Sequence, residues 1–202
     1  MQVVDFITSN ENKIEWANEI ASKGGYDIRF KKRHYEFEEG RSTDPEEIAL
    51  KKVRQGMEVE TNPFVVEDSG FFIDALNGFP GTFVKFGLST IGIKGIITLL
   101  NGVNGEERTY SIKSAIGYGN PELKTKKVVI SSSIGKIGSE FVYGNDHGWG
   151  EIMGIIIPDG YATTVTLFSD TDWQHYRNDV IKGDAFSVSL GKILKIISDG
   201  SV

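Results

Sequence analysis

The N-terminal half of the chain alternates between short apolar runs, which are typical of β-strands, and stretches whose apolar positions recur at helical spacing. One helical stretch begins with Asp44 and Pro45 followed by two glutamates, and proline and acidic residues favour the first turn of a helix. The predicted strands cover residues 3–7, 26–32 and 63–66, and the predicted helices cover residues 13–21, 44–59 and 90–100. This alternation predicts an α/β fold.

The middle of the chain has a different pattern. Three segments rich in β-branched residues follow one another, separated by glycine, asparagine and proline, which predicts a meander of strands. These segments cover residues 108–118, 126–133 and 136–143, and a strand over 155–157 and a last helix over 185–197 follow. Since no repeat or flexible linker separates the two patterns, we expect the β-rich part to continue the first sheet, with a ligand cleft between the parts.

The composition limits the kind of protein. At 202 residues the chain is long enough for one large domain or two closely packed lobes, and 39% hydrophobic residues support a core. The net charge of −6 argues against a dedicated nucleic-acid-binding protein, which needs clustered lysine and arginine. The chain has no cysteine, no secretory start, and no apolar run of the roughly 20 residues that span a bilayer. We therefore expect a soluble, cytoplasmic protein without a nucleic-acid or membrane partner.

The segment from Val66 to Gly70 carries the clearest chemical signal. Glu67 and Asp68 end the apolar run of the predicted strand, and Ser69 and Gly70 follow at once. Mg²⁺ prefers oxygen ligands, and one or two carboxylates plus substrate phosphates and water complete its shell. The motif therefore indicates a magnesium site for a phosphorylated substrate. The alternative is that Asp68 or Ser69 only caps a turn, and the motif alone favours neither interpretation.

Two further segments contain residues that suit phosphate binding. Thr8, Asn10 and Lys13 lie where a strand enters a helix, so hydroxyl, amide and ammonium groups could converge on a phosphate; the alternative is an ordinary helix cap. On the helix over 44–59, Lys51 and Lys52 point in different directions, and one of them could reach the cleft, although a helix lysine more often faces solvent. Glu36 alternates with aromatic residues, which directs it to the opposite face of an extended segment.

Five motifs, in this order along the chain, resemble the inosine/xanthosine triphosphate pyrophosphatase family. They are Thr8-x-Asn10-x-x-Lys13, Glu67-Asp68-Ser69-Gly70, Ala75-Leu76-x-Gly78-x-Pro80-Gly81, Thr90-Ile91-Gly92 and Ile157-Pro158-Asp159-Gly160. The resemblance covers most of the chain. It implies Mg²⁺-dependent hydrolysis of deaminated purine nucleoside triphosphates (ITP, dITP, XTP) to the monophosphate and pyrophosphate, by a homodimer.

The resemblance also implies a fold. The family has an elongated mixed β-sheet with flanking helices, and two lobes surround a nucleotide-binding cleft. For this chain the implied arrangement is a single two-lobed domain over residues 1–202. An α/β lobe takes about 1–107 plus 184–202, and a β-rich lobe takes about 108–183.

The resemblance assigns roles to individual residues. Asp68 and Glu67 would be the catalytic acidic pair, in which Asp68 would bind Mg²⁺ and align or deprotonate the attacking water. Glu36 would be a second metal-binding carboxylate. Lys13 would serve both catalysis and triphosphate binding. The implied substrate-binding set is Thr8, Asn10, Lys13, Lys52, Ser69, Trp149, Gly150, Lys182 and Ser187.

The C-terminal third departs from the family pattern. Trp149-Gly150-Glu151-Ile152 stands where the family has Phe-Gly-aromatic-Asp, so the aspartate is missing, although Trp149 could stack on a purine. Near Lys182 and Ser187 the family's His-Arg pair is absent, and this pair contacts the 6-keto purine. We therefore predict relaxed or altered base preference. The alternatives are a nucleotide-binding or regulatory homologue without turnover, and a purely structural homologue.

Overall fold

The structure, a computed structural model, describes residues 1–38, 42–145, 147–148 and 150–200. The strands are β1 Gln2–Ile7, β2 Ile28–Arg33, β3 Phe64–Ile73, β4 Pro80–Gly81, β5 Thr109–Asn120, β6 Thr125–Ile137 and β7 Ile156–Pro158. The α-helices are α1 Glu11–Lys23, α2 Pro45–Val59, α3 Val84–Thr90, α4 Gly92–Leu99, α5 Asp170–Asn178 and α6 Ala185–Ser198. Short 3₁₀ helices are η1 Asp74–Leu76, η2 Gly105–Glu107, η3 Glu151–Gly154 and η4 Val165–Leu167.

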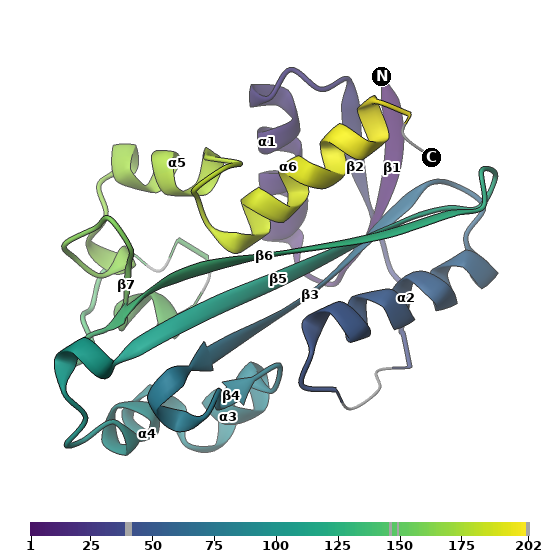
Figure 1. The fold of residues 1–202 in the computed structure, drawn as a ribbon. Helices are drawn as coiled ribbons and strands as arrows, with labels where there is room; N and C mark the ends of the chain where they lie inside the picture. The colour runs from purple at the N-terminus through teal and green to yellow at the C-terminus, as the bar shows by residue number, and fades with distance from the viewer. Residues whose placement is uncertain (39–41, 146, 149, 201–202) are drawn as a thin grey trace.

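In the described part of the chain, seven strands form one mixed sheet. The order is β2-β1-β3-β5-β6-β7, and the short β4 pairs with β3. β1 is parallel to both β2 and β3, whereas the remaining pairs are antiparallel. β5 and β6 form a long hairpin that runs along the molecule (Figure 1). The predicted α/β class and the elongated mixed sheet are confirmed.

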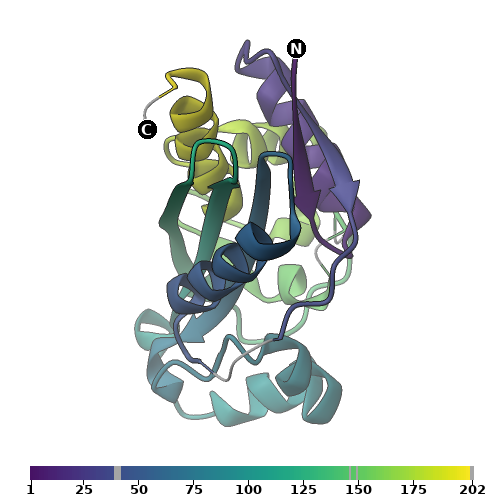
Figure 2. The same cartoon turned by 90° about the vertical axis from the view of Figure 1, so that its right-hand side faces the viewer.

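Helices cover both faces of the sheet. α1 and α6 lie together over one face, and α2 lies over the other, as the two views show (Figures 1 and 2). α3 and α4 gather near β4, at the end of the sheet away from the N-terminus (Figure 1). Among the described residues, no helix combines the length and the apolar character needed to cross a membrane.

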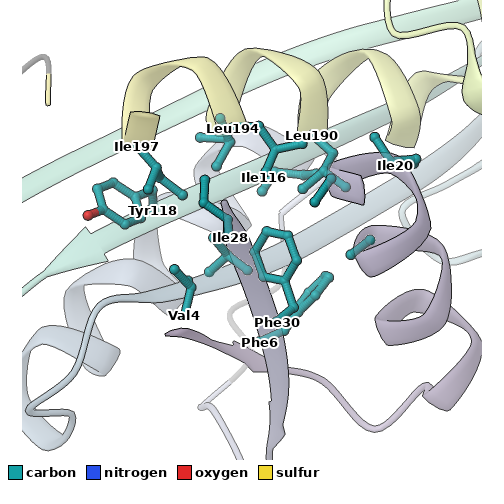
Figure 3. Close-up of a cluster of buried hydrophobic side chains, with 14 of the residues drawn as sticks. Val4, Phe6, Ile20, Ile28, Phe30, Ile116, Tyr118, Leu190, Leu194 and Ile197 are labelled. Carbon is teal, nitrogen blue, oxygen red and sulfur yellow. The ribbon is translucent and has the colours of Figure 1, made fainter. Parts of the chain in front are cut away.

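Three clusters of buried side chains hold these layers together. The cluster in Figure 3 joins α1 and α6 to the sheet, and within it Phe6 of β1 stacks on Phe186 of α6 with ring centroids 6.3 Å apart. A second cluster packs α4 and α5 around the far end of β3, β5 and β6. A small third cluster, which includes Val53 and Phe64, lies under α2. The predicted division into two lobes stays a prediction, and α4 shares its cluster with residues on both sides of position 108.

The structure corrects two predicted strands. The strand expected over 63–66 continues to Ile73, so Glu67 and Asp68 lie inside β3 and not at its end. The strand expected over 126–133 continues through Gly135 to Ile137 as β6, whereas residues 138–143 of the strand expected over 136–143 lie in no strand. A Cβ at Gly135 would lie 2.2 Å from the carbonyl oxygen of Ile157. This glycine therefore allows β7 to approach, and it does not mark a turn.

Two predicted helical features also differ. The helix expected over 90–100 corresponds to α4, and Gly92 at φ +65° separates it from α3, a helix over 84–90 that was not predicted. Helix α5 was not predicted, since it is short and its composition is polar. Its signal was the capping box formed by Ser169 and Asp172, in which each residue's side chain pairs with the backbone of the other.

Candidate active site

The candidate site lies at a gap in the sheet beside β3. Ile7, the last residue of β1, pairs with Val66, and β4 begins to pair with β3 only at Phe71. Residues 67–70 therefore have a strand neighbour only on the β5 side, within the described sheet. The chain turns from β1 into α1 over this gap. The gap exposes polar side chains in the middle of a strand, which explains why the site is not at a strand end.

The turn between β1 and α1 is held by its own side chains. The Thr8 hydroxyl accepts a hydrogen bond from the Asn10 backbone N–H at 3.1 Å, and the Asn10 side chain accepts one from Asn12 N–H at 3.0 Å. Asn10 is thus the N-cap of α1, and the capping alternative is confirmed for it. The cap also fixes the N-terminus of α1, whose backbone dipole favours an anion, against the gap.

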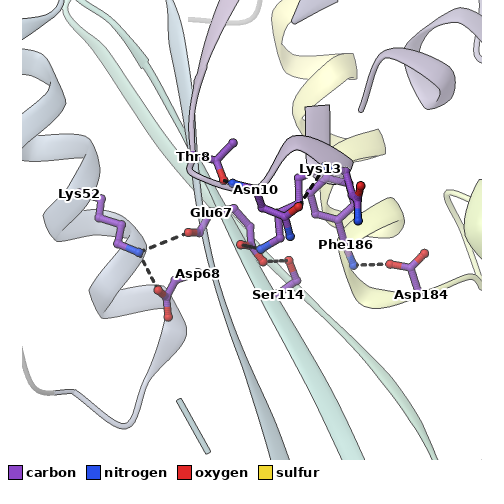
Figure 4. A network of polar contacts seen from close by, with 10 residues as sticks. Thr8, Asn10, Lys13, Lys52, Glu67, Asp68, Ser114, Asp184 and Phe186 are labelled. Atoms are coloured by element: carbon purple, nitrogen blue, oxygen red, sulfur yellow. Dashed lines mark hydrogen bonds and ion pairs between the residues drawn. The ribbon is translucent and has the colours of Figure 1, made fainter. Parts of the chain in front are cut away.

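Glu67 and Asp68 point to opposite faces of the sheet, as adjacent residues in a strand must. Each carboxylate pairs with a lysine from the helix on its own face: Glu67 with Lys13 of α1, and Asp68 with Lys52 of α2 (Figure 4). The Lys52 ammonium lies 2.7 Å from Asp68 Oδ1 and 3.4 Å from the Glu67 carbonyl oxygen. β3 therefore carries one lysine–carboxylate pair on each of its faces, at the adjacent residues Glu67 and Asp68.

Both pairs are largely withdrawn from solvent. The side chains of Glu67 and Lys13 are 5% and 17% exposed, and those of Asp68 and Lys52 are 17% and 11% exposed. Burial raises the pKa of Asp68 above its ordinary value, while the Lys52 charge and hydrogen bond oppose that rise. The nearby Glu67 carboxylate raises the Asp68 pKa further. Asp68 is thus a better proton acceptor than an exposed aspartate.

A cavity of about 890 Å³ opens over this point of the sheet. Eight of the residues predicted for the site line it, namely Thr8, Asn10, Lys13, Glu36, Lys52, Glu67, Asp68 and Ser69. They come from the turn between β1 and α1, from α1, from the segment after β2, from α2 and from β3, so segments distant in sequence converge here. Glu36 is exposed, while the neighbouring Tyr35 and Phe37 pack against the cluster under α2. This confirms the expected alternation of these three side chains.

Other predicted residues lie elsewhere or cannot be placed. Ser187 is fully buried, and its hydroxyl donates to the Asp184 carboxylate at 2.6 Å and to the Arg177 carbonyl. Burial raises the pKa of Asp184 to about 6. Lys182 lines a separate cavity beside α5, and Gly150 precedes η3 without lining the large cavity. Trp149 lies outside the described residues.

Several lining residues were missed from sequence. Trp16 lies one helical turn after Lys13, and this i, i+3 spacing places both on one side of α1. Ile152 and Met153 of η3 and the backbone of Gly148 also line the cavity, and their sequence pattern predicts only a core. Lys85, from the start of α3, adds a third lysine to the lining.

The acidic residues of the site suit a metal ion whose remaining ligands are supplied by the substrate and by water. Within the described ranges, no group of three or more histidine or acidic side chains is close enough to hold a metal ion on its own. Asp68 and the exposed Glu36 do line the cavity. One or two carboxylates are the usual protein share of a Mg²⁺ shell, with phosphate oxygens and water as the other ligands. The donor set therefore suits Mg²⁺ bound together with a phosphorylated substrate.

Solved structures of low sequence identity have the same fold. A HAM1 protein from Coxiella burnetii superimposes with a TM-score of 0.77 at 17% identity, over 98% of this chain and 100% of that one. The Staphylococcus aureus Ham1 protein gives a TM-score of 0.75 at 16% identity, over the whole of both chains.

Sequence relatives are closer. A dITP/XTP pyrophosphatase of Saccharolobus solfataricus is 32% identical over 176 residues, which is 87% of this chain and 86% of that protein. One of Methanopyrus kandleri is 39% identical over 116 residues, but the match spans only 57% of this chain and 60% of that protein. The Ham1 family model matches residues 4–172, a range that contains most of β1, all of β2 to β7 and the whole cavity lining. The chain therefore belongs to the Ham1 family, the inosine/xanthosine triphosphate pyrophosphatase family that its motifs resemble.

Proposed function

We propose that this protein hydrolyses non-standard purine nucleoside triphosphates (ITP, dITP and XTP) to the monophosphate and pyrophosphate, with Mg²⁺. The observation that carries the proposal is the pair of lysine–carboxylate contacts on the two faces of β3. Both pairs line one cavity, and the N-terminus of α1 lies beside them. Relatives that align along most of the chain are named dITP/XTP pyrophosphatases, which supports this substrate class.

The lysines supply the binding of the phosphate chain. Without substrate, Lys13 and Lys52 are each neutralised by a carboxylate. A triphosphate brings several negative charges to the N-terminus of α1 and competes for both ammonium groups. Each ammonium then turns toward a phosphate, which weakens its contact with its own carboxylate, and Thr8 and Ser69 offer hydroxyls to the phosphate chain. Phosphoryl transfer requires mainly such positioning and charge neutralisation.

Asp68 supplies the acid–base chemistry in this proposal. Its raised pKa brings it closer to neutral pH, where a general base works best, while Lys52 keeps it ionised. Its carboxylate then aligns the attacking water and accepts a proton from it. Bound Mg²⁺, held by Asp68 and Glu36 with the substrate phosphates, would offset the negative charge that develops on the transferred group.

The wall formed by Trp16, Ile152 and Met153 supports relaxed base preference. These side chains offer aromatic and apolar surface, and Gly148 adds backbone polar groups. Apolar surface discriminates weakly between bases, because strong discrimination comes from buried hydrogen-bonding groups left unpaired by the wrong substrate. We propose that this wall is part of the base pocket, together with Trp149.

The test is metal-dependent release of pyrophosphate from ITP, dITP, XTP, dUTP and the four standard triphosphates. We expect turnover of the deaminated purines to exceed that of an Asp68→Asn variant by a wide margin. Binding of these nucleotides without turnover would instead support a nucleotide-binding homologue. If the protein neither binds nor cleaves any of them, the proposal is wrong.

Replacing Lys13 by alanine should weaken the binding of every triphosphate to the same degree. A hydrogen bond to a charged group contributes about 1.5–3 kcal/mol, so we expect a loss of about 10- to 100-fold for each nucleotide. The loss is uniform because a phosphate contact carries no information about the base. Calorimetric titrations with ITP, XTP and ATP measure this. Lys23→Ala, at the other end of α1, serves as the control, and a base-dependent loss would contradict the assignment.

Replacing Trp149 by alanine tests the base pocket. Stacking of a base on an aromatic ring contributes about 1–3 kcal/mol, so nucleotide affinity should fall by roughly 5- to 150-fold. Inorganic triphosphate has no base, and its affinity should not change. Equal losses for the nucleotide and for inorganic triphosphate, or no loss at all, would remove Trp149 from the pocket.

We also propose a cytoplasmic homodimer. The absence of cysteine fits a reducing compartment, and α3 and α4 carry exposed apolar side chains, of which Phe86 is 67% exposed. Sedimentation of the purified protein tests the oligomeric state.

A further inference from the structure

A buried serine on β5 contacts the carboxylate that pairs with Lys13. The Ser114 hydroxyl donates a hydrogen bond to Glu67 Oε1 at 3.0 Å, while Glu67 Oε2 accepts from the Lys13 ammonium (Figure 4). Ser114 is 1% exposed. Its cross-strand partner is Ser69, which lies two residues beyond Glu67 and so shares its face of β3. The two oxygens of Glu67 thus have different partners, one in the sheet and one on a helix.

The backbone of Ser114 is itself held by a hydrogen bond from α6. Ser189 of α6, which is fully buried, donates its hydroxyl to the Ser114 carbonyl oxygen at 2.7 Å. A chain of hydrogen bonds therefore runs from α6 through Ser114 and Glu67 to Lys13 of α1. Hydrogen bonds to both carboxylate oxygens restrict the rotamer of Glu67, and Glu67 in turn restricts Lys13.

We infer that Ser114 is a positioning residue, which holds Glu67 so that Lys13 is kept ready at the mouth of the cavity for the phosphate chain. The inference rests on the proposed function, because it assigns Ser114 a task in triphosphate binding. Nothing in the Ser114 side chain reaches the cavity, since it is absent from the described lining and its hydroxyl is directed to Glu67.

Ser114 is needed because Lys13 shifts from Glu67 toward a phosphate when substrate binds. As the Lys13 ammonium turns toward a phosphate, its contact with Glu67 weakens, and Glu67 is only 5% exposed to water. A buried carboxylate that loses a donor is costly unless another donor remains. The Ser114 hydroxyl remains hydrogen-bonded to Glu67, so Glu67 stays in place while Lys13 shifts. Without Ser114, Glu67 would retain Lys13 as its main partner, and the phosphate would compete less well.

The test compares Ser114→Ala and Ser114→Thr with Ser131→Ala. Ser131 is the cross-strand neighbour of Ser114 on β6, is 8% exposed, and contacts Lys192 outside the site, so it controls for loss of a buried hydroxyl from the same sheet. We expect Ser114→Ala to raise KM for triphosphates about tenfold with a smaller change in kcat, because one hydrogen bond to a charged group is lost. Ser114→Thr retains the hydroxyl and should restore KM, and Ser131→Ala should leave it unchanged.

A double-mutant cycle separates action through Glu67 from a general effect on folding. In a Glu67→Gln background, Ser114→Ala should cause no further rise in KM, because the carboxylate that it positions is already gone. Additive losses, or equal effects of the alanine and threonine variants, would overturn the inference.

Binding of inorganic triphosphate tests the role of Ser114 even if the protein has no catalytic activity. If the wild-type protein releases no pyrophosphate from any nucleotide, the proposed function fails. Calorimetry with inorganic triphosphate still measures the Lys13 contact in the same variants. A weaker affinity for Ser114→Ala alone supports the inference in that case, and equal affinities for all three variants refute it.

Discussion

Replacing Asp68 by asparagine should lower kcat for pyrophosphate release by about 10²- to 10⁴-fold, the range lost when a general base is removed. Asparagine keeps the shape of the side chain but can neither accept the proton of the attacking water nor offer a full charge to Mg²⁺. Triphosphate binding should persist, because Lys52 loses its carboxylate partner and becomes more available to phosphate. Single-turnover measurements at saturating ITP and Mg²⁺ separate the chemical step from binding.

The matched control for this variant is Asp74→Asn. Asp74 begins η1 directly after β3 and does not line the cavity, so the same change of charge occurs on the same segment of chain without touching the site. We expect its kcat to equal that of the wild type. Full activity of Asp68→Asn, or an equal loss in both variants, would show that Asp68 is not the base.

The sequence predicts the parts of the site that are built locally. Thr8, Asn10 and Lys13 lie within one strand–turn–helix unit, and Asn10 caps the helix whatever the rest of the chain does. Which lysine of α2 reaches the site does not follow from the local sequence pattern. Helical spacing does not choose between Lys51 and Lys52, and the family resemblance alone assigns Lys52. The packing of α2 on β3 buries Lys52 against Asp68 and leaves Lys51 exposed.

The parts that depend on strand pairing could not be predicted. Whether β3 ends at Val66 or continues depends on β5, which pairs with residues 64–73 and lies far along the chain. The same pairing brings Ser114 to Glu67 across 47 positions of sequence, and nothing in the alternation of β5 marks that serine as different from its neighbours. The sequence therefore identifies the two carboxylates, whereas the pairing of β3 with β5 determines which side chains lie next to them on each face of the sheet.

Replacing Lys52 by methionine should shift the pH dependence of activity. Asp68 must be ionised to act as a base, so kcat/KM is present above its pKa and is lost as the pH falls through it. Burial already raises this pKa above 3.8, and Lys52 holds it down. Removing this opposite charge raises the pKa of Asp68 further, so the acid limb of the variant should move to higher pH. A pH profile of kcat/KM for ITP between pH 4 and 9 measures the shift.

The stability of the Lys52→Met variant should also depend on pH. In the variant the folded-state pKa of Asp68 rises further above its unfolded value, so the folded protein binds the proton more tightly than the unfolded chain. The stability lost through Lys52→Met is therefore largest at neutral pH and is recovered as the pH falls through the raised pKa. Lys51→Met, which removes the same charge from the neighbouring exposed position of α2, should show neither effect. Parallel thermal melts of both variants at pH 5 and pH 8 decide between a role for the Lys52–Asp68 pair and a general loss of positive charge.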